Sequence, residues 1–598
     1  MLVCCSVVLL GLTPFPDRRQ PIGVEHTVAY FKTNAGDFAA QVRALEMRIN
    51  EIDEQDSITV VPAREALINS RLAFKRIEFF FNYFFPSLTI IYNAPAVIEV
   101  EEPFMESREP TGLQVIEALL YSTTPAAGKK ALQQQVALLQ EASADLNSLL
   151  YNLPVSDAQI LESVRLDLIS VLLLGTAGFD TPEMKTGITE ANQSLKTFAT
   201  VLEPYLEEKT TQADSVRYYL QKAIQLTGVS ADFNGFDRLG LLMQAGLPLQ
   251  RWLGQLIAAL GLELNSTAYL NYKAADIFRS EAININDRLG VDSLLAALGR
   301  KLFFEKSLSG NLTRSCATCH QPEKYYTDGL PKSKTIDEKG FVKRNAPTLL
   351  YAAFQHSQFW DGRVKSLEQQ VEEVLENPVE MNGRRDSIVQ RLVSSREYQA
   401  AFRNAFREST TDTLISMDRI STAIAAFLKT LAPFSSPFDQ YINGDSRAMS
   451  SEQIRGYNLF MGKALCGTCH TAPLFNGLTP PLFDLTAMEV IGTTKDTMFT
   501  RPRLDEDMGR FETYPIRFYM RAFKTPSLRN VAATAPYMHN GAFQDLASVV
   551  EFYNKGGGEG LGLTVPHQTL SAAPLRLDAG EVKSIVAFLQ ALTDQQVP

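Results

Sequence analysis

The residues with the clearest capacity for chemistry are two cysteine pairs, each followed directly by a histidine. They are Cys316, Cys319 and His320 in the string SCATCH, and Cys466, Cys469 and His470 in the string LCGTCH. A zinc half-site, a disulfide or chance could explain one such string. In the CxxCH pattern, two thiols can bond to the vinyl groups of haem and the adjacent imidazole can bind its iron. A four-ligand zinc site would use both pairs and needs no histidine after each. The sequence therefore predicts two covalently bound haem c groups.

Composition places the chain among ordinary globular proteins. It has 598 residues, of which 45% are hydrophobic, and a formal net charge of -10. This length suggests about four domains of ~150 residues each. The acidic balance argues against a phosphate-binding surface, so no nucleic-acid partner is expected, although a local patch for a basic redox partner stays open.

The first residues resemble an export leader. Residues 2–12, LVCCSVVLLGL, form an apolar run that is too short to span a bilayer and lies where the core of a signal peptide would lie. The usual basic residues before it are missing, so a lipid anchor at Cys4 or Cys5 is the alternative to a cleaved leader over residues 1–20. No later segment is long and apolar enough to be a membrane helix. A periplasmic protein, soluble or anchored, is expected.

Residues 25–285 are expected to form a helical bundle of unknown role. In DFAAQVRALEMRINEI, apolar residues recur at the spacing of one buried helix face. This region contains one histidine, His26, and no cysteine, so it offers few haem or metal ligands. The segment EPTGLQVIEALLY resembles the GxHxxE region of imelysin-like periplasmic domains, with Gln114 at the histidine position and Glu117 at the glutamate. The exchange of histidine for glutamine argues against a metal there.

An internal repeat divides the second half of the chain. The order helix, Gly, Leu-Phe, CxTCH, Pro, Gly-Leu occurs twice, and Cys316 and Cys466 begin the two motifs. We therefore expect two tandem cytochrome c-like haem domains, over residues 286–445 and 446–598. The last segment, GEVKSIVAFLQALT, has a single apolar stripe, as expected for a helix that closes over a haem. The predicted fold class is all-α, with the helical bundle followed by the two haem domains.

Several separated motifs in this half resemble those of one family. They are LGRKLFFEKSLSGNLTRSCATCHQPEKYYTDGL, RNAPTLL, QFWDGR, NPVEM, FKTPSLRNVAATAPYMHNG and VVEFYNKGG. Their order and distances are similar to those of the bacterial dihaem cytochrome c peroxidases and their MauG-like relatives, over about residues 290–595. The first half of the chain lies outside this resemblance.

The resemblance implies that His320 is the proximal ligand of a first, peroxide-reacting haem. Many members carry a distal histidine in the following loop, but the loop here has none. The first haem is therefore expected to be open to peroxide, unless Tyr325, Tyr326 or a lysine binds the iron. Glu380 in NPVEM corresponds to the distal glutamate of the family, and Gln370 to its pocket glutamine. A partly desolvated carboxyl group can move a proton between the oxygens of peroxide.

Further residues are assigned by the same resemblance. Trp360 in QFWDGR corresponds to the residue that lies between the haems and carries electrons, whereas His356 is expected to have an orienting or packing role. The family also binds a calcium ion between its haem units, and Asn345, Thr534 and Pro536 match its protein ligands. Oxygen donors suit calcium.

The second haem is expected to have His470 and Tyr553 as axial ligands. Tyr553 lies fourteen residues after His539, where peroxidases that accept electrons at high potential carry a methionine. A tyrosine at this position is similar to MauG, in which phenolate ligation helps the haem to hold a high oxidation state. Met538 is a competing ligand, whereas His539 and His567 are expected to be structural.

The leading prediction is a periplasmic dihaem peroxidase that reduces hydrogen peroxide with electrons from a small cytochrome or similar redox protein. The alternative is a MauG-like enzyme that uses peroxide to oxidise a protein or organic substrate, and Tyr553 favours it. A pure electron-transfer protein is a third hypothesis, against which the open first haem and Glu380 argue. The expected cofactors are two haem c groups and one calcium ion. Whether the chain forms a homodimer stays open.

Overall fold

The computed structural model describes residues 20–101, 104–230, 232–264, 292–407, 414–483 and 486–598. Helices dominate these residues, and their strands form only two short antiparallel pairs, as expected for an all-α fold. None of the described helices is both long and apolar enough to cross a membrane. Two predictions fall outside the described residues. They are the leader with Cys4 and Cys5, of which only residue 20 is described, and the domain boundary expected at 285.

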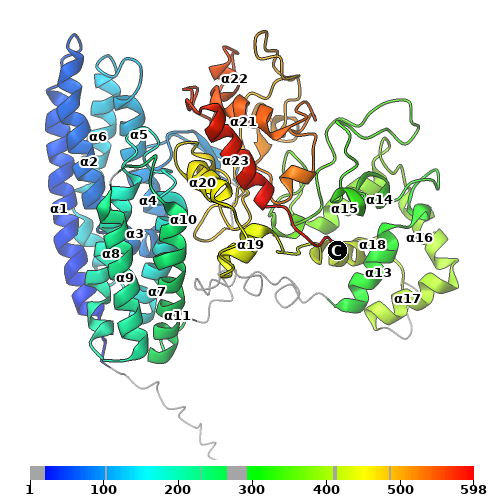
Figure 1. Ribbon diagram of the computed structural model, residues 1–598, viewed down its shortest axis with the longest axis horizontal. Helices are drawn as coiled ribbons and strands as arrows, with labels where there is room; N and C mark the ends of the chain where they lie inside the picture. Colours follow the sequence, from blue (N-terminus) through cyan, green and yellow to red (C-terminus); the bar gives the residue numbers. More distant parts are fainter. Residues whose placement is uncertain (1–19, 102–103, 231, 265–291, 408–413, 484–485) are drawn as a thin grey trace, which may run out of the picture.

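The N-terminal half is a bundle of long helices with one small hairpin (Figure 1). Its α-helices are α1 (Val24–Asn50), α2 (Val61–Phe74), α3 (Glu78–Phe84), α4 (Pro86–Asn93), α5 (Leu113–Leu120), α6 (Lys129–Ser143), α7 (Asp157–Ser170), α8 (Gly187–Leu202), α9 (Thr211–Val229), α10 (Arg238–Leu241) and α11 (Leu247–Leu260). Two π-helical turns, η3 (Val171–Gly175) and η5 (Leu242–Gly246), extend α7 and α10. The hairpin pairs β1 (Glu99–Glu101) with β2 (Glu106–Arg108).

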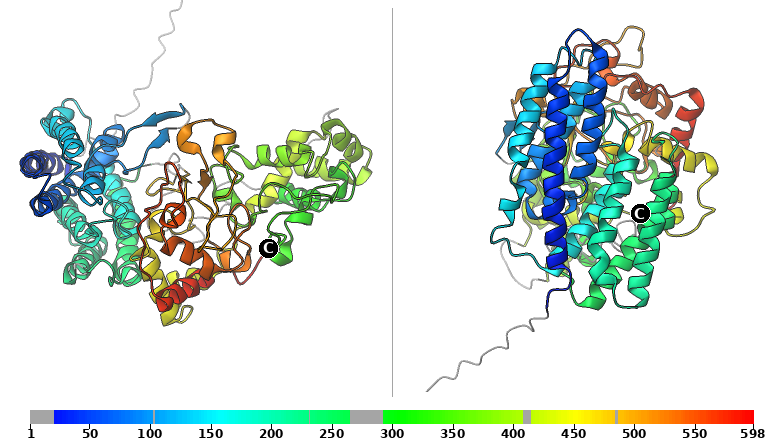
Figure 2. Two further views of the ribbon diagram at one scale, coloured as in Figure 1. Left: turned by 90° about the horizontal axis from the view of Figure 1, so that it is seen from above. Right: turned by 90° about the vertical axis from the view of Figure 1, so that its left-hand side faces the viewer.

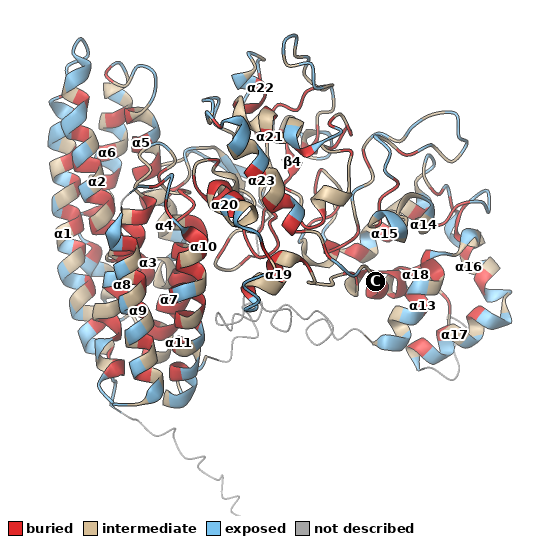
Figure 3. Cartoon of the chain, in the orientation of Figure 1, coloured by how far each residue is buried: buried red, intermediate tan, exposed pale blue. Residues whose placement is uncertain are grey.

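Apolar spacing explains the longest helix of this bundle. Along α1, the side chains of Phe31, Phe38, Val42, Leu45 and Ile49 are fully buried and recur every three to seven residues, on one face of the helix. This face packs against α2 and α6. Figure 3 shows buried residues gathered on the inner sides of the bundle helices, with exposed residues outside.

The C-terminal half contains shorter helices and long connecting loops. Its α-helices are α13 (Ser293–Phe303), α14 (Cys316–Cys319), α15 (Leu367–Glu376), α16 (Arg385–Val393), α17 (Arg396–Phe406), α18 (Met417–Lys429), α19 (Pro437–Ile442), α20 (Ser451–Met461), α21 (Leu546–Asn554), α22 (Gly557–Gly560) and α23 (Ala579–Ala591). A two-stranded sheet pairs β3 (Met488–Glu489) with β4 (Phe523–Lys524).

The internal repeat appears as two similar helix crossings. In the first unit α13 packs against α18, and in the second α20 packs against α23. A glycine lies at each crossing: a Cβ atom on Gly299 would come within 1.8 Å of the Ala423 carbonyl oxygen, and one on Gly456 within 2.0 Å of the Ser584 carbonyl oxygen. Only glycine allows backbones to approach this closely, so the repeated Gly fixes the same packing twice.

The order of the parts in space differs from their order in the sequence. The second unit, yellow to red in Figure 1, lies between the N-terminal bundle and the green first unit, and the view from above in Figure 2 agrees. Direct contacts join α10 to α20. Val100 and Met105 of the bundle hairpin also pack against a small apolar cluster around Val490 and Val565. The bundle is therefore attached to the second unit.

Candidate functional site: two CxxCH loops and the residues between them

The first CxxCH string forms a single capped helical turn. Ser315 and Thr318 make reciprocal side-chain and backbone contacts that start α14 at Cys316. The His320 amide donates to the Cys316 carbonyl at 3.0 Å, which places the imidazole at the end of the turn. His320 Nδ1 lies 3.0 Å from the Tyr326 carbonyl oxygen. Such a contact fixes the orientation of the ring, as it does in histidines that bind metals.

The second string repeats this geometry. Cys466–Thr468 forms a 3-10 turn, and His470 Nδ1 lies 3.1 Å from the Phe475 carbonyl oxygen. Burial lowers the pKa of His470 to about 4, so its imidazole is neutral at pH 7. Neutral imidazole is the form that binds a metal ion. Both loops therefore present a fixed, half-buried histidine beside two thiols.

The donor set fits haem c at each loop. The four thiols are free, with no disulfide in either pair, and all are partly buried. The pairs lie in different units. Within the described ranges, no three or more His, Cys, Asp or Glu side chains gather in a way that could hold a metal ion. Cys316, Cys319 and His320 would hold one haem, and the corresponding residues of the second string the other.

Glu380 lies beside the first loop, in the turn after α15. Burial raises the pKa of its carboxyl group, although Arg363 opposes this, and Asn377 Nδ2 donates to Glu380 Oε1 at 2.7 Å. Burial also raises the pKa of Cys319, and the nearby Glu380 carboxylate adds to that rise. Gln370 lies on α15 and is half-buried. The structure thus brings Glu380 close to the first cysteine pair, with a raised affinity for a proton.

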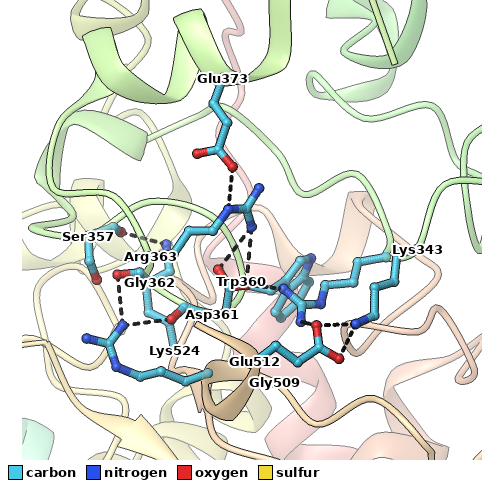
Figure 4. A network of polar contacts seen from close by, with 12 residues as sticks. Lys343, Ser357, Trp360, Asp361, Gly362, Arg363, Glu373, Gly509, Glu512 and Lys524 are labelled. Atoms are coloured by element: carbon cyan, nitrogen blue, oxygen red, sulfur yellow. Dashed lines mark hydrogen bonds and ion pairs between the residues drawn. The ribbon is translucent and has the colours of Figure 1, made fainter. Parts of the chain in front are cut away.

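Trp360 contacts both units (Figure 4). Its indole Nε1 donates to the Asn345 carbonyl at 2.9 Å, and its own carbonyl accepts from the Lys524 amide at 2.8 Å. The following residue, Asp361, is bound by two arginines. Arg344 donates to its carboxylate at 2.5 Å, and Arg363 donates to it at 3.1 Å. These contacts fix the indole at the junction of the two units.

Asp361 is in turn part of a larger polar network. Arg510 of the second unit donates to the Asp361 carbonyl at 2.8 Å, and Arg363 pairs with Glu373 of α15 at 2.6 Å. Lys343 pairs with Glu512 across the same junction. The network connects the Trp360 loop to α15 on one side and to the second unit on the other.

The three residues expected to bind calcium lie in the same part of the molecule. Asn345 Nδ2 donates to the Leu330 carbonyl at 2.9 Å, and its amide donates to the His539 carbonyl at 2.7 Å, which ties it to the second unit. Thr534 and Pro536 follow a 3-10 turn of that unit. Calcium binding by these residues stays a prediction.

Tyr553 lies beside the second cysteine pair. It is carried by α21, and its pKa is raised by burial and then by the nearby Cys469, Cys466 and Glu489. The tertiary structure therefore brings the predicted axial tyrosine, 83 residues from His470 in the sequence, to the second haem loop. Its role as a ligand stays a prediction.

Glu489 was not expected from the sequence. This half-buried carboxyl group on β3 accepts from the Thr569 hydroxyl and from Cys469 Sγ at 3.7 Å. No sequence motif marks it, because only the tertiary fold places it beside the cysteine loop.

The other candidate ligands of the sequence have different partners. The hydroxyls of Tyr325 and Tyr326 donate to the carbonyls of Asp594 at 3.3 Å and Pro598 at 2.6 Å. His539 Nε2 lies 3.1 Å from Asp505 Oδ1, and the His539 ring stacks on Phe523. His567 packs edge-on against Phe518, and His356 is exposed. These contacts favour structural roles for the histidines.

The imelysin-like segment lies in a buried ionic network within the bundle. Gln114 Nε2 donates to Asp180 Oδ1 at 3.2 Å, and the Glu117 carboxylate accepts from the backbone amides of residues 183 and 184. Lys75 pairs with Asp180 at 2.5 Å, and Arg71 with Glu190 at 2.8 Å. The lysine and the arginine supply the positive charge in this cluster.

The buried Lys524 is expected to make the free energy of unfolding depend on pH. Its ammonium group is buried at the junction, bonded to the Ser357 carbonyl at 3.1 Å and to Gln355, and burial lowers its pKa to about 7. The unfolded chain keeps this proton to about pH 10. Between these values the unfolded state binds more protons, so the free energy of unfolding rises with pH by up to ~1.4 kcal/mol per unit.

Lys524→Met is expected to remove this rise between pH 7 and pH 10, as measured by urea denaturation of the haem-loaded protein. The matched control is Lys555→Met, which replaces a half-exposed lysine paired with Glu551 at 2.9 Å. Equal slopes in wild type and Lys524→Met would contradict a depressed pKa.

Two CxxCH turns in paired helical units define a c-type cytochrome with two haems. Comparison with known proteins agrees with this class of protein. The family model described as di-haem cytochrome c peroxidase matches residues 294–447. A cytochrome-c peroxidase IdrP2 of Denitromonas iodatirespirans is 34% identical over 317 residues, which are 50% of this chain and 82% of that protein.

The methylamine utilization protein MauG of Methylorubrum extorquens is also 34% identical, over 50% of this chain and 77% of that protein. A crystal structure of a MauG-like protein associated with microbial copper homeostasis matches 51% of this chain and 90% of that chain, at 30% identity and a TM-score of 0.43. The chain therefore belongs to the dihaem cytochrome c peroxidase and MauG family. Membership supports two haem c groups and an oxidoreductase activity of the dihaem peroxidase type.

Proposed function

We propose that the chain is a periplasmic dihaem cytochrome c peroxidase. It would reduce hydrogen peroxide, with two electrons and two protons, to two molecules of water. The electrons would come from a small cytochrome or similar redox protein. When bound, haem supplies an iron centre that takes up peroxide at the first loop and one that exchanges electrons at the second.

The observation that carries this proposal is the position of Glu380. Its carboxyl group lies beside Cys319 of the first loop, and burial raises its pKa. A carboxyl group in such a place holds its proton to a higher pH than an exposed glutamate does, and it can deliver that proton to the departing oxygen of peroxide. Gln370 on α15 would orient the substrate. Trp360, bonded to residues of both units, would provide the electronic connection between them.

A second candidate function is MauG-like oxidation of a protein or organic substrate with peroxide. The observation in its favour is Tyr553, which lies beside Cys466 and Cys469. A phenolate ligand there would stabilise the oxidised iron more than a thioether does. The relatives do not separate the two functions, since a peroxidase and a MauG are equally similar to this chain.

Peroxide kinetics separate the candidates. The chain is produced in a host competent in cytochrome c maturation and mixed with peroxide and a reduced small cytochrome. Rapid oxidation of the cytochrome supports the peroxidase. A persistent peroxide-induced absorption change with negligible cytochrome turnover supports the MauG-like function. Absence of any reaction with peroxide would contradict both and leave electron transfer.

Removal of the second cysteine pair tests the assignment of the haems. The variant Cys466→Ala, Cys469→Ala is expected to fall from two covalently bound haems per chain to one, as measured by the pyridine haemochrome assay, because thioether bonds hold each group. It should also lose oxidation of the donor cytochrome. A variant that keeps two covalent haems would contradict the assignment.

A further inference from the structure

The N-terminal bundle contacts the second haem unit at the loop that carries its cysteines. A Cβ atom on Gly178, just after η3, would lie 3.4 Å from the Leu465 side chain, and one on Gly467 would lie 3.5 Å from the Cβ of Ala177. Leu465 and Gly467 flank Cys466. The bundle therefore touches the backbone that positions the second haem, although the first haem unit, expected at residues 286–445, separates the two in the sequence.

Asn458 of α20 forms two hydrogen bonds between the second haem unit and the bundle. Its Oδ1 accepts from the Leu239 amide at 3.0 Å, and its Nδ2 donates to Asp237 Oδ1 at 2.9 Å. Both partners flank Arg238 at the start of α10. The two hydrogen bonds thus join the start of α10 to α20, which leads into the cysteine loop.

Arg238 is the charged residue at the centre of this contact. It is 3% exposed, and one of its terminal nitrogens would lie 2.5 Å from a Cβ atom on Gly462, the residue that ends α20. Such a close approach requires glycine at this position. The guanidinium group therefore packs against Gly462, four residues before Cys466.

The positive charge of Arg238 has no carboxylate within hydrogen-bond distance in the described part of the chain. Its nitrogens donate to three backbone carbonyls, those of Thr176 at 2.7 Å, Phe236 at 3.2 Å and Phe233 at 2.6 Å. The guanidinium carbon also lies 4.4 Å from the centre of the Phe233 ring.

The surroundings of Arg238 include few compensating charges. The buried Tyr457 phenol and the exposed Asp232 carboxylate act on its charge, and the exposed Asp237 acts on Tyr457 in turn. Burial lowers the pKa of Arg238 to about 10, which still leaves it charged at neutral pH. A buried cation with weak compensation acts over several ångströms, because the local dielectric constant is low.

We propose that the N-terminal bundle tunes the second haem through Arg238, a positioning residue whose buried charge raises the reduction potential of that haem. A nearby positive charge disfavours the loss of an electron from the iron, so it stabilises the reduced state. This inference rests on the proposed assignment of the second haem to Cys466, Cys469 and His470. It gives the bundle a role in the redox chemistry of the protein.

Potentiometric titration of the haem-loaded chain tests the proposal without peroxide or a donor. Arg238→Gln is expected to lower the potential of the second haem by about 59 mV, which corresponds to a tenfold change in a one-electron equilibrium. The potential of the first haem should not move. Arg238→Lys, titrated at pH 6 so that a buried lysine keeps its proton, should stay near wild type.

Two matched controls separate charge from packing. Arg64→Gln replaces an arginine that also donates to a backbone carbonyl, that of Leu120, and also lies over an aromatic ring, but belongs to α2 on the far side of the bundle (Figure 1). Asn458→Ala removes both hydrogen bonds of the contact without changing a charge. Neither variant should move the potential of the second haem.

The opposite change provides a second measurement that does not disturb the buried site. Asp232→Asn removes an exposed countercharge of Arg238 and is expected to raise the potential, by about a twofold change in the equilibrium. The proposal would be overturned if Arg238→Gln left the potential of the second haem unchanged. If that variant does not fold, an unchanged potential in Asp232→Asn would overturn it. It would also be overturned if Asn458→Ala shifted the potential as much as Arg238→Gln does. A wild-type chain with only one covalent haem would instead overturn the assignment of the second haem, and the proposal with it.

Discussion

Replacement of Glu380 by glutamine is expected to slow the turnover of peroxide by about two to four orders of magnitude, the usual contribution of a general acid or base. This corresponds to a rise in the activation free energy of ~3 to 5 kcal/mol. The amide is nearly equal in size to the carboxyl group and keeps a contact with Asn377, which now lies 2.7 Å from Glu380 Oε1. It cannot deliver a proton. The measurement is the rate of donor oxidation at saturating peroxide.

The matched control for this experiment is Glu376→Gln. Glu376 is an exposed carboxylate at the end of α15 and pairs with Arg385 at 2.8 Å, so it is close in sequence to Glu380 but takes no part in the first loop. Its replacement should leave turnover within about twofold of wild type, because exposed ion pairs contribute little. Similar rates in Glu380→Gln and wild type would remove Glu380 from the mechanism.

The pH dependence gives a second check on Glu380. Because burial raises the pKa of its carboxyl group, the group holds its proton to a higher pH than an exposed glutamate does. In wild type, the pH profile of kcat/KM should show an ionisation above the ordinary range of a carboxylic acid, and Glu380→Gln should lose it. A profile that keeps this ionisation in the variant would assign it to another group.

Replacement of Tyr553 by methionine is expected to change the second haem more than any other single substitution. Axial ligands set haem potentials over a range of about 0.8 V. A thioether favours the reduced iron, whereas a phenolate favours the oxidised iron, so the potential of the second haem should rise. The electronic and low-temperature EPR spectra of that haem should change with it, and those of the first haem should not.

Tyr553→Phe is the matched variant, because it removes only the phenolic oxygen. If Tyr553 binds the iron, both variants lose the signals of the tyrosine-bound haem, and only methionine supplies a replacement ligand. In the MauG-like function, both should also shorten the lifetime of the peroxide-induced absorption change. Unchanged spectra and potentials in both variants would show that another residue, such as Met538, or no residue at all, occupies this position.

Much of the candidate site could be predicted from the sequence. The CxxCH strings form short turns, and their chemistry depends on residues only a few positions apart, so local sequence is enough to predict it. The periodic apolar residues of α1 indicated a buried helix face for the same reason. The repeated glycines at 299 and 456 belonged to the internal repeat, and the structure shows that each lies at a helix crossing, where only glycine tolerates so close an approach.

Residues brought together from distant segments were harder to predict. The motif resemblance indicated Glu380 and Tyr553, and the tertiary structure places each beside a cysteine pair. Glu489 carries no motif, and only the tertiary fold places it beside Cys469. The burial that raises the pKa of these groups is a property of the packed molecule, because it depends on neighbours from several helices.

The sequence by itself determined the two haem-binding loops, the helical character of the chain and its family, because these depend on local spacing and short motifs. Only the tertiary structure decided which parts meet. The bundle precedes the first haem unit in the sequence but packs on the second, and this contact buries Arg238 against Gly462. Such a contact joins surfaces more than two hundred residues apart, and nothing in the local pattern of either segment specifies the other.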